Sequence, residues 1–463
     1  MVLPGRVPEG MAPNGMSQGL AGVSGQGPPK RERGIKDMSS AVVGLIILVV
    51  CVVLFLTEWI PNSVTACLGC TMMVLLNVCS FDEVFSSFSN SIVVLMVGAM
   101  VVGIAMFDTG VAQLVGRSVI RCSKGSGRLF LLIGGLVAGI LSMFLANTAI
   151  IAAFLPIIDS VCRVSPEMRR KDLCLPIACA AMYGGASTLI GCTPQLTANG
   201  LMEQMVGIQM GMWDLTRPGL CLLVLYLLYI QIMGYRRGQK LWGNRPEETM
   251  DLDQAAVRSV MESKPDRKKL VIMSIIVVLM IVFYAGAWIS TAMTAVCAAL
   301  LCIILGCCDA KSVIKQMNWD CVLFLGGCLG LANGFTASGA GNLITEWVSG
   351  LLGDMVSPMF LFAVLVLLTL LISQFITNST AIIITLPVAF SLCQVYGYSL
   401  MPFCLGITLG ASIACSTPLA AAQIAMTQVA GYKFSDYFRY TWPMSLISYL
   451  GILIFVPLFY PLV

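Results

Sequence analysis

The sequence predicts an all-α polytopic membrane protein made of two inverted repeats, each with five transmembrane helices and one re-entrant hairpin. Three observations support this fold class. The composition is strongly apolar, one short motif occurs twice, and the basic residues gather in a few of the predicted loops.

Composition indicates an integral membrane protein. Hydrophobic residues make up 58% of the chain and charged residues 11%, and the mean hydropathy is +0.90, whereas soluble domains carry roughly 25% charged residues. The net charge of +4 belongs to loops, so it gives no support for nucleic-acid binding. The chain has no histidine, which excludes His-based nucleophilic triads, HExxH zinc sites and histidine proton relays. We interpret the 19 scattered cysteines as small apolar fillers rather than metal ligands or disulfides.

The predicted elements follow one another along the chain with short loops. Residues 1–40 are rich in Gly, Pro, Met and Ser and are predicted to form a disordered tail. The apolar runs after it are 41–59, 63–79, 91–116, 129–162, 173–200, 218–234, 270–288, 291–308, 319–346, 356–396, 402–428 and 442–462. A single crossing needs about 20 residues, so 129–162 and 356–396 are too long for one helix and are predicted to be re-entrant hairpins.

Basic residues predict the orientation, because Lys and Arg favour the cytoplasmic side. Clusters flank 129–162 at both ends, so this hairpin is expected to enter from the cytoplasm, and 356–396, which lacks nearby basic residues, from the outside. The resulting domains are a first repeat at 41–234, a cytoplasmic linker at 235–269 and a second repeat at 270–463. This topology puts 21 of the 27 basic residues in the cytoplasm and predicts a multi-pass protein of the cell (plasma or inner) membrane, surrounded by lipid.

The repeated motif lies inside the two hairpins. FLANTAIIAAFLP at 144–156 and FITNSTAIIITLP at 375–387 each place a small polar triplet within an apolar run. Each hairpin is followed by a helix with its own polar break, at 184–200 and 410–425. Polar residues and broken helices at membrane depth are tolerated mainly around a cavity or site, and paired interruptions in two halves predict a transporter binding site.

These motifs resemble the divalent-anion/sodium symporter family, whose members carry dicarboxylates, citrate or sulfate with sodium. The similarity covers about 41–463 and includes LTEWIPNSVTA, FSNSIVVLMVGA, GGASTLIGCTPQ and NWDCVLFLGGCLGL. It implies a homodimer in which each protomer has a scaffold and a moving transport domain, the elevator type of transporter. Carried over by position, it implies one sodium site at Ser142, Ala146, Asn147 and Gly191 and a second at Ser373, Ile376, Asn378 and Ala420.

Amide and hydroxyl donors with half-helix N-termini can hold an anion without arginine, while nearby sodium neutralises its charge. The expected substrate ligands are Asn147, Thr148, Thr193, Pro194, Thr377, Asn378 and Ser379. The asparagines could instead be interhelical hydrogen-bond partners, and Ser142, Ser187 and Ser373 could bond back to their own helix.

Two departures from the family leave the substrate open. The first triplet has Ala146 where serine is usual, and the usual Pro-Pro-Asn of the breaks reads Thr193-Pro194-Gln195 and Ala421-Ala422-Gln423. We therefore expect sodium-coupled symport of a small di- or multivalent anion, with an anion exchanger or proton-coupled permease of the same fold as the alternative. A membrane enzyme is not expected, because it would need paired carboxylates, histidine or clustered cysteine; a non-transporting receptor stays a third possibility.

Overall fold

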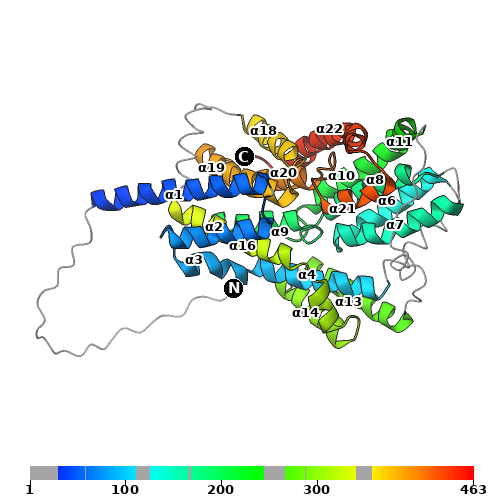
Figure 1. The fold of residues 1–463 in the computed structure, drawn as a ribbon, viewed down its shortest axis with the longest axis horizontal. Helices are drawn as coiled ribbons and strands as arrows, with labels where there is room; N and C mark the ends of the chain where they lie inside the picture. Colours follow the sequence, from blue (N-terminus) through cyan, green and yellow to red (C-terminus); the bar gives the residue numbers. More distant parts are fainter. Residues whose placement is uncertain are drawn as a thin grey trace, which may run out of the picture.

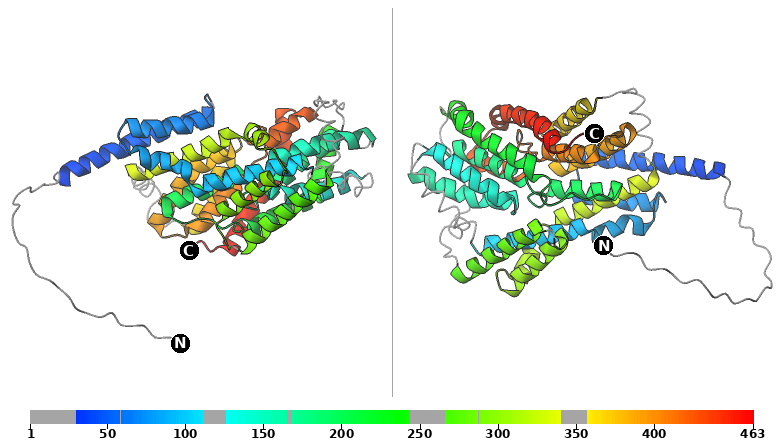
Figure 2. Two further views of the ribbon diagram at one scale, coloured as in Figure 1. Left: turned by 90° about the horizontal axis from the view of Figure 1, so that it is seen from below. Right: turned by 180° about the vertical axis from the view of Figure 1, so that it is seen from behind.

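A computed structural model describes residues 30–57, 59–110, 126–164, 168–243, 266–286, 288–339 and 357–463. These ranges contain helices and connecting loops and no strand, which confirms the all-α prediction. Figures 1 and 2 show an elongated bundle in which the long α1 extends beyond the other helices. The helices of the first half are α1 Lys30–Thr57, α2 Asn62–Leu75, α3 Phe81–Phe85, η1 Ser86–Ser89, α4 Ser91–Asp108, α6 Gly127–Ser142, α7 Asn147–Val164, α8 Arg170–Gly185, α9 Thr193–Val206, α10 Thr216–Tyr229, η2 Ile230–Gly234 and α11 Tyr235–Trp242. Those of the second half are α13 Arg267–Gly286, α14 Thr291–Ile304, α15 Ala310–Gln316, α16 Trp319–Ser338, α18 Pro358–Ile372, α19 Asn378–Tyr396, α20 Leu400–Ser412, α21 Ala422–Ala425, η3 Met426–Ala430 and α22 Phe434–Phe459.

Several helices have the length and composition of membrane spans. Within the described ranges, six helical segments are long and apolar enough to cross a membrane, and six further apolar helices have 10–17 residues. The protein is therefore a multi-pass membrane protein. The count of ten crossings, the inversion of the two halves and the cytoplasmic side of each loop stay predictions.

Each predicted hairpin consists of two helices joined by a short non-helical link. The links are 143–146 between α6 and α7 and 373–377 between α18 and α19. Small residues let the first hairpin pack closely on α8: a Cβ placed on Gly184 would overlap the backbone of Gly139. Close backbone approach at glycine is typical of helix packing in membranes. The second hairpin packs on α20, and α19 also packs on α9 from the first half.

Two predicted non-helical segments are partly helical. Helix α1 begins at Lys30, so residues 30–40 of the predicted tail are helical and the tail prediction is wrong for this part. Residues 1–29 lie outside the described ranges. Lys, Arg and Glu are good helix formers, and extending an existing helix avoids the cost of nucleation. The predicted linker starts with α11, and 244–265 lie outside the described ranges.

Two basic residues predicted to be loop signals are buried at the start of α8. Arg170 is 8% exposed and its Nε lies 2.7 Å from Asp159 Oδ1, on α7 of the first hairpin. Lys171 is also buried, at 6% exposure. Arg163 lies 2.8 Å from the other oxygen of the same carboxylate but is largely exposed. These residues are therefore more than loop charges that set the orientation. An acidic partner within the hairpin allows Arg170 to be buried.

Candidate functional site

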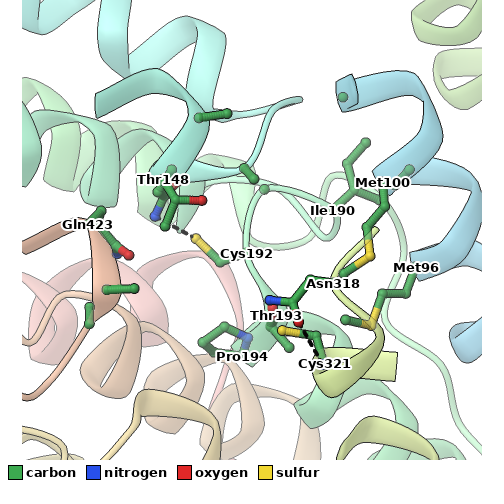
Figure 3. Close-up of a pocket in the computed structure, with 18 of the residues that line it drawn as sticks. Met96, Met100, Thr148, Ile190, Cys192, Thr193, Pro194, Asn318, Cys321 and Gln423 are labelled. Atoms are coloured by element: carbon green, nitrogen blue, oxygen red, sulfur yellow. Dashed lines mark hydrogen bonds between the residues drawn. The ribbon is translucent and has the colours of Figure 1, made fainter. Parts of the chain in front are cut away.

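Both hairpin links and both helix breaks meet at one cavity of about 610 Å³. Its lining comes from α4, the starts of α7, α16 and α19, and the breaks that precede α9 and α21. All seven predicted substrate ligands line it: Asn147, Thr148, Thr193, Pro194, Thr377, Asn378 and Ser379. Figure 3 shows Thr148 and Gln423 on one side of this cavity and Pro194 below, with Cys192 between them. Segments that are far apart in sequence therefore line the same cavity.

In the first hairpin, the side chain of Asn147 is held from two directions. Its Oδ1 accepts a hydrogen bond from Ser142 Oγ, and its Nδ2 donates to Cys192 Sγ at 3.0 Å. The residue is only 6% exposed. A Cβ at Gly185 would overlap Asn147 Oδ1, so the glycine at the end of α8 makes room for the amide. The break after α8 thus orients the tip of the hairpin.

The second hairpin repeats this local geometry. Ser373 Oγ lies 2.8 Å from Asn378 Oδ1 and 3.0 Å from the Ala411 carbonyl, and both hairpin residues are buried. The serine and asparagine are five positions apart in both halves. Thr377 caps α19 by accepting from Thr380 N at 3.4 Å. The two copies of the motif therefore have similar sequences and also form equivalent serine–asparagine contacts.

A second pair of equivalent contacts was missed by the sequence reasoning. Thr188 Oγ1 donates to the Met143 carbonyl in the first half, and Thr417 Oγ1 donates to the Gln374 carbonyl in the second. Each threonine belongs to a break and satisfies a carbonyl that the hairpin link leaves outside a helix. The signal was present in the sequence, because a Ser-Thr pair occurs in both breaks, at 187–188 and 416–417.

The helices that begin at the cavity include α7 at Asn147, α9 at Thr193 and α19 at Asn378. A helix N-terminus carries partial positive charge and unpaired N–H groups, which favour an anion. All the side chains that line the cavity are uncharged. The described residues contain no group of three or more His, Cys, Asp or Glu that could hold a metal ion. The groups of this cavity that can attract an anion are therefore helix ends, amides and hydroxyls.

The residues expected to bind sodium divide into two groups. Ala146, Asn147, Gly191, Asn378 and Ala420 line the cavity, while Ser142, Ser373 and Ile376 lie buried behind it. The carbonyl of Ala146 accepts from the N–H groups of Ala149 and Ile150, at 3.0 and 3.2 Å, so it is used by the first turn of α7. At the spacing of the repeat, the counterpart of Ile376 is Leu145 rather than Ala146.

The alternatives for the three serines have different outcomes. Ser187 Oγ donates a hydrogen bond to the Tyr183 carbonyl at 2.9 Å, so this serine bonds back to its own helix. Ser142 and Ser373 instead contact the hairpin asparagines. The cysteines described by the structure are all free, and most of them are buried.

Known proteins similar to this chain are transporters. The sequence profile of the citrate transporter family matches residues 52–366, which is more than half of the chain. An uncharacterized transporter of Synechocystis sp. is 33% identical over 186 residues, which cover 40% of this chain and 30% of the relative. The sodium-dependent dicarboxylate transporter SdcS of Staphylococcus saprophyticus is 25% identical over 369 residues, covering 72% of this chain and 69% of the relative. The SdcS of Staphylococcus aureus is 26% identical over 338 residues, with coverages of 66% and 64%. The matches thus span under a third of the first relative and about two thirds of the others.

Solved structures support the fold. The YdaH transporter of Alcanivorax borkumensis aligns with a TM-score of 0.58 at 14% identity, covering 82% of this chain and 87% of that one. MtrF of Neisseria gonorrhoeae, described with a class of antimetabolite efflux pumps, aligns with a TM-score of 0.54 at 14% identity, with coverages of 81% and 82%.

The profile match confirms the resemblance read from the hairpins and breaks, and it confirms that the chain is related to transporters and not to enzymes. The protein belongs to the citrate transporter family.

Proposed function

We propose that the protein is a secondary active transporter that carries a small di- or multivalent anion together with sodium across the cell membrane by alternating access. The observation that supports this most is the meeting of both asparagine-tipped hairpins at one uncharged cavity. Neutral oxygens are suitable ligands for a hard cation, and helix N-termini are suitable for an anion. The relative SdcS is a sodium-dependent dicarboxylate transporter, which agrees with this proposal.

Each proposed sodium site combines a hairpin serine and asparagine with backbone carbonyls from the link and the nearby break. The first set is Ser142 and Asn147 with the backbone of Gly191; the second is Ser373 and Asn378 with the backbone of Ile376 and Ala420. Because the Ala146 carbonyl already accepts two N–H groups, Leu145 is the better candidate for the remaining carbonyl of the first site.

The proposed anion lies between the two sodium sites. Its oxygens accept from the Asn147, Asn378 and Ser379 side chains and from the N-terminal amides of α7, α9 and α19. Sodium at both tips offsets the charge of the anion, so anion binding depends on sodium. In this proposal the two halves are inverted repeats, 41–234 and 270–463, whose hairpins move against a scaffold that forms a homodimer.

Uptake into proteoliposomes tests the coupling. We expect purified protein to accumulate succinate, citrate or sulfate when sodium is higher outside, and to stop when the gradient is dissipated. Uptake that ignored sodium but followed a pH step would replace sodium coupling with proton coupling. Uptake that required only an anion on the opposite side would indicate exchange.

A further inference from the structure

The cavity has two unlike walls. The hairpin tips and the first break supply amides and hydroxyls, whereas α4 supplies a single apolar stripe. The stripe consists of Met96, Met100, Ile104 and Phe107, spaced so that they lie on one face of the helix. Figure 3 shows Met96 and Met100 projecting from α4 toward the side where Thr193 and Cys321 lie. A bound molecule would therefore meet polar groups at one end and hydrocarbon and thioether groups at the other.

The second break makes the cavity asymmetric. Where the first break presents the Thr193 hydroxyl and Pro194, the second presents the methyl groups of Ala421 and Ala422 beside the Gln423 amide. A symmetric dianion would therefore meet different groups at the two breaks. A ligand with one polar and one apolar end fits both sides better.

Cavity size also exceeds what a compact anion needs. A volume of about 610 Å³ lies within the range of roughly 300–1,000 Å³ that holds drug-sized ligands. A small dicarboxylate at the tips would leave the α4 wall covered by water, whereas an apolar substituent would displace that water with a favourable free energy.

The cavity lining as a whole is rich in sulfur. Cavity-lining methionines and cysteines are Met96, Met100, Met317, Met426, Cys192 and Cys321. Methionine is flexible and polarizable, adapts to varied shapes and makes favourable contacts with aromatic rings. Met100 and Met426 are only half-buried, so their side chains border the open space and are not locked in the core.

We propose that the substrate is an amphipathic anion: a carboxylate end held at the hairpin tips and an aromatic or branched hydrocarbon body against the α4 stripe. This inference rests on the proposed function, because it takes the hairpin tips as the anion site. In the competing explanation, the stripe is an apolar surface along which the hairpins move during transport, and it does not contact the substrate.

Graded substrates distinguish these explanations. Succinate, methylsuccinate and phenylsuccinate share the two carboxylates and differ only in the apolar substituent. Their apparent dissociation constants are measured by thermal stabilisation of the purified full-length protein, in sodium and in choline. In wild type we expect affinity to rise in this order, with phenylsuccinate roughly tenfold or more tighter than succinate, because its ring leaves water.

Met100→Gln tests the wall, with Met359→Gln as the matched control. Met359 is 40% exposed on α18 and does not line the cavity. We expect Met100→Gln to reduce the phenylsuccinate-to-succinate affinity ratio severalfold, and Met359→Gln to leave that ratio at the wild-type value.

Each outcome decides the inference. Equal wild-type affinities for succinate and phenylsuccinate, or a ratio that Met100→Gln leaves unchanged, overturn it even if binding needs sodium, and the proposed function then stands alone. A preference for phenylsuccinate that persists in choline supports the amphipathic substrate while sodium coupling fails. Failure of all three anions to stabilise the protein in either salt overturns both.

Discussion

Removing the Ser373 hydroxyl tests the second proposed sodium site. The hydroxyl lies 2.8 Å from Asn378 Oδ1, and Ser373 is fully buried. A neutral hydrogen bond contributes about 1 kcal/mol, and a buried acceptor left without a partner costs about 1–3 kcal/mol. Since the hydroxyl both orients the asparagine and is itself a proposed ligand, we expect Ser373→Ala to weaken sodium binding by about 1–2 kcal/mol, which is roughly 5- to 30-fold.

The assay is the sodium dependence of thermal unfolding of the purified protein, with choline keeping the ionic strength constant. The matched control is Ser391→Ala, also on the second hairpin. Ser391 is 8% exposed, and its hydroxyl donates to the Pro387 carbonyl of its own helix at 3.0 Å. We expect the control to change the unfolding temperature slightly but to leave the apparent sodium affinity unchanged. If both variants weaken sodium binding equally, or neither does, the ion-site reasoning is wrong.

Three further predictions address two sets of contacts around the cavity and one ion pair outside it. Thr188→Val and Thr417→Val each remove the donor to a hairpin-link carbonyl, so both should weaken sodium-dependent stabilisation severalfold; an effect of only one variant would contradict equivalent roles in the two halves. Gly185→Ala places a methyl group where the first hairpin's asparagine amide lies, so anion uptake should fall at least tenfold while expression persists; normal uptake would show that the amide position is not essential. Asp159→Asn removes the carboxylate that lies 2.7 Å from the buried Arg170 Nε, and we expect a loss of about 3 kcal/mol in unfolding free energy. For Arg163→Gln, at the exposed arginine on the same carboxylate, we expect a loss of less than about 1 kcal/mol; similar losses in denaturant titrations would refute the difference.

Much of the site could be predicted because its signals are local in sequence. The triplets around Asn147 and Asn378 interrupt apolar runs, and such interruptions are visible without a structure. Because the same kind of triplet occurs at the same place in each hairpin, the sequence predicts two equivalent hairpin tips. The seven substrate ligands predicted from the sequence all line the cavity.

Other parts of the site depend on distances that a linear pattern does not contain. The stripe on α4, from Met96 to Phe107, reads as an ordinary apolar helix, and only its position opposite the hairpins makes it a cavity wall. The burial of Arg170 likewise depends on Asp159, which the fold brings to it from the preceding hairpin. The direction of backbone groups also matters, since the Ala146 carbonyl accepts hydrogen bonds from the first turn of α7.

By itself, the sequence determined that the protein is a helical membrane protein and that a polar triplet interrupts the apolar run of each hairpin. These properties follow from hydrophobic burial and from backbone hydrogen bonding, which operate on neighbouring residues. Tertiary structure alone decided which breaks hold which tips and that one wall of the shared cavity is apolar. The contacts between breaks and tips join residues 38 to 45 positions apart, and the cavity is lined by both halves of the chain. This geometry therefore exists only once the helices have packed.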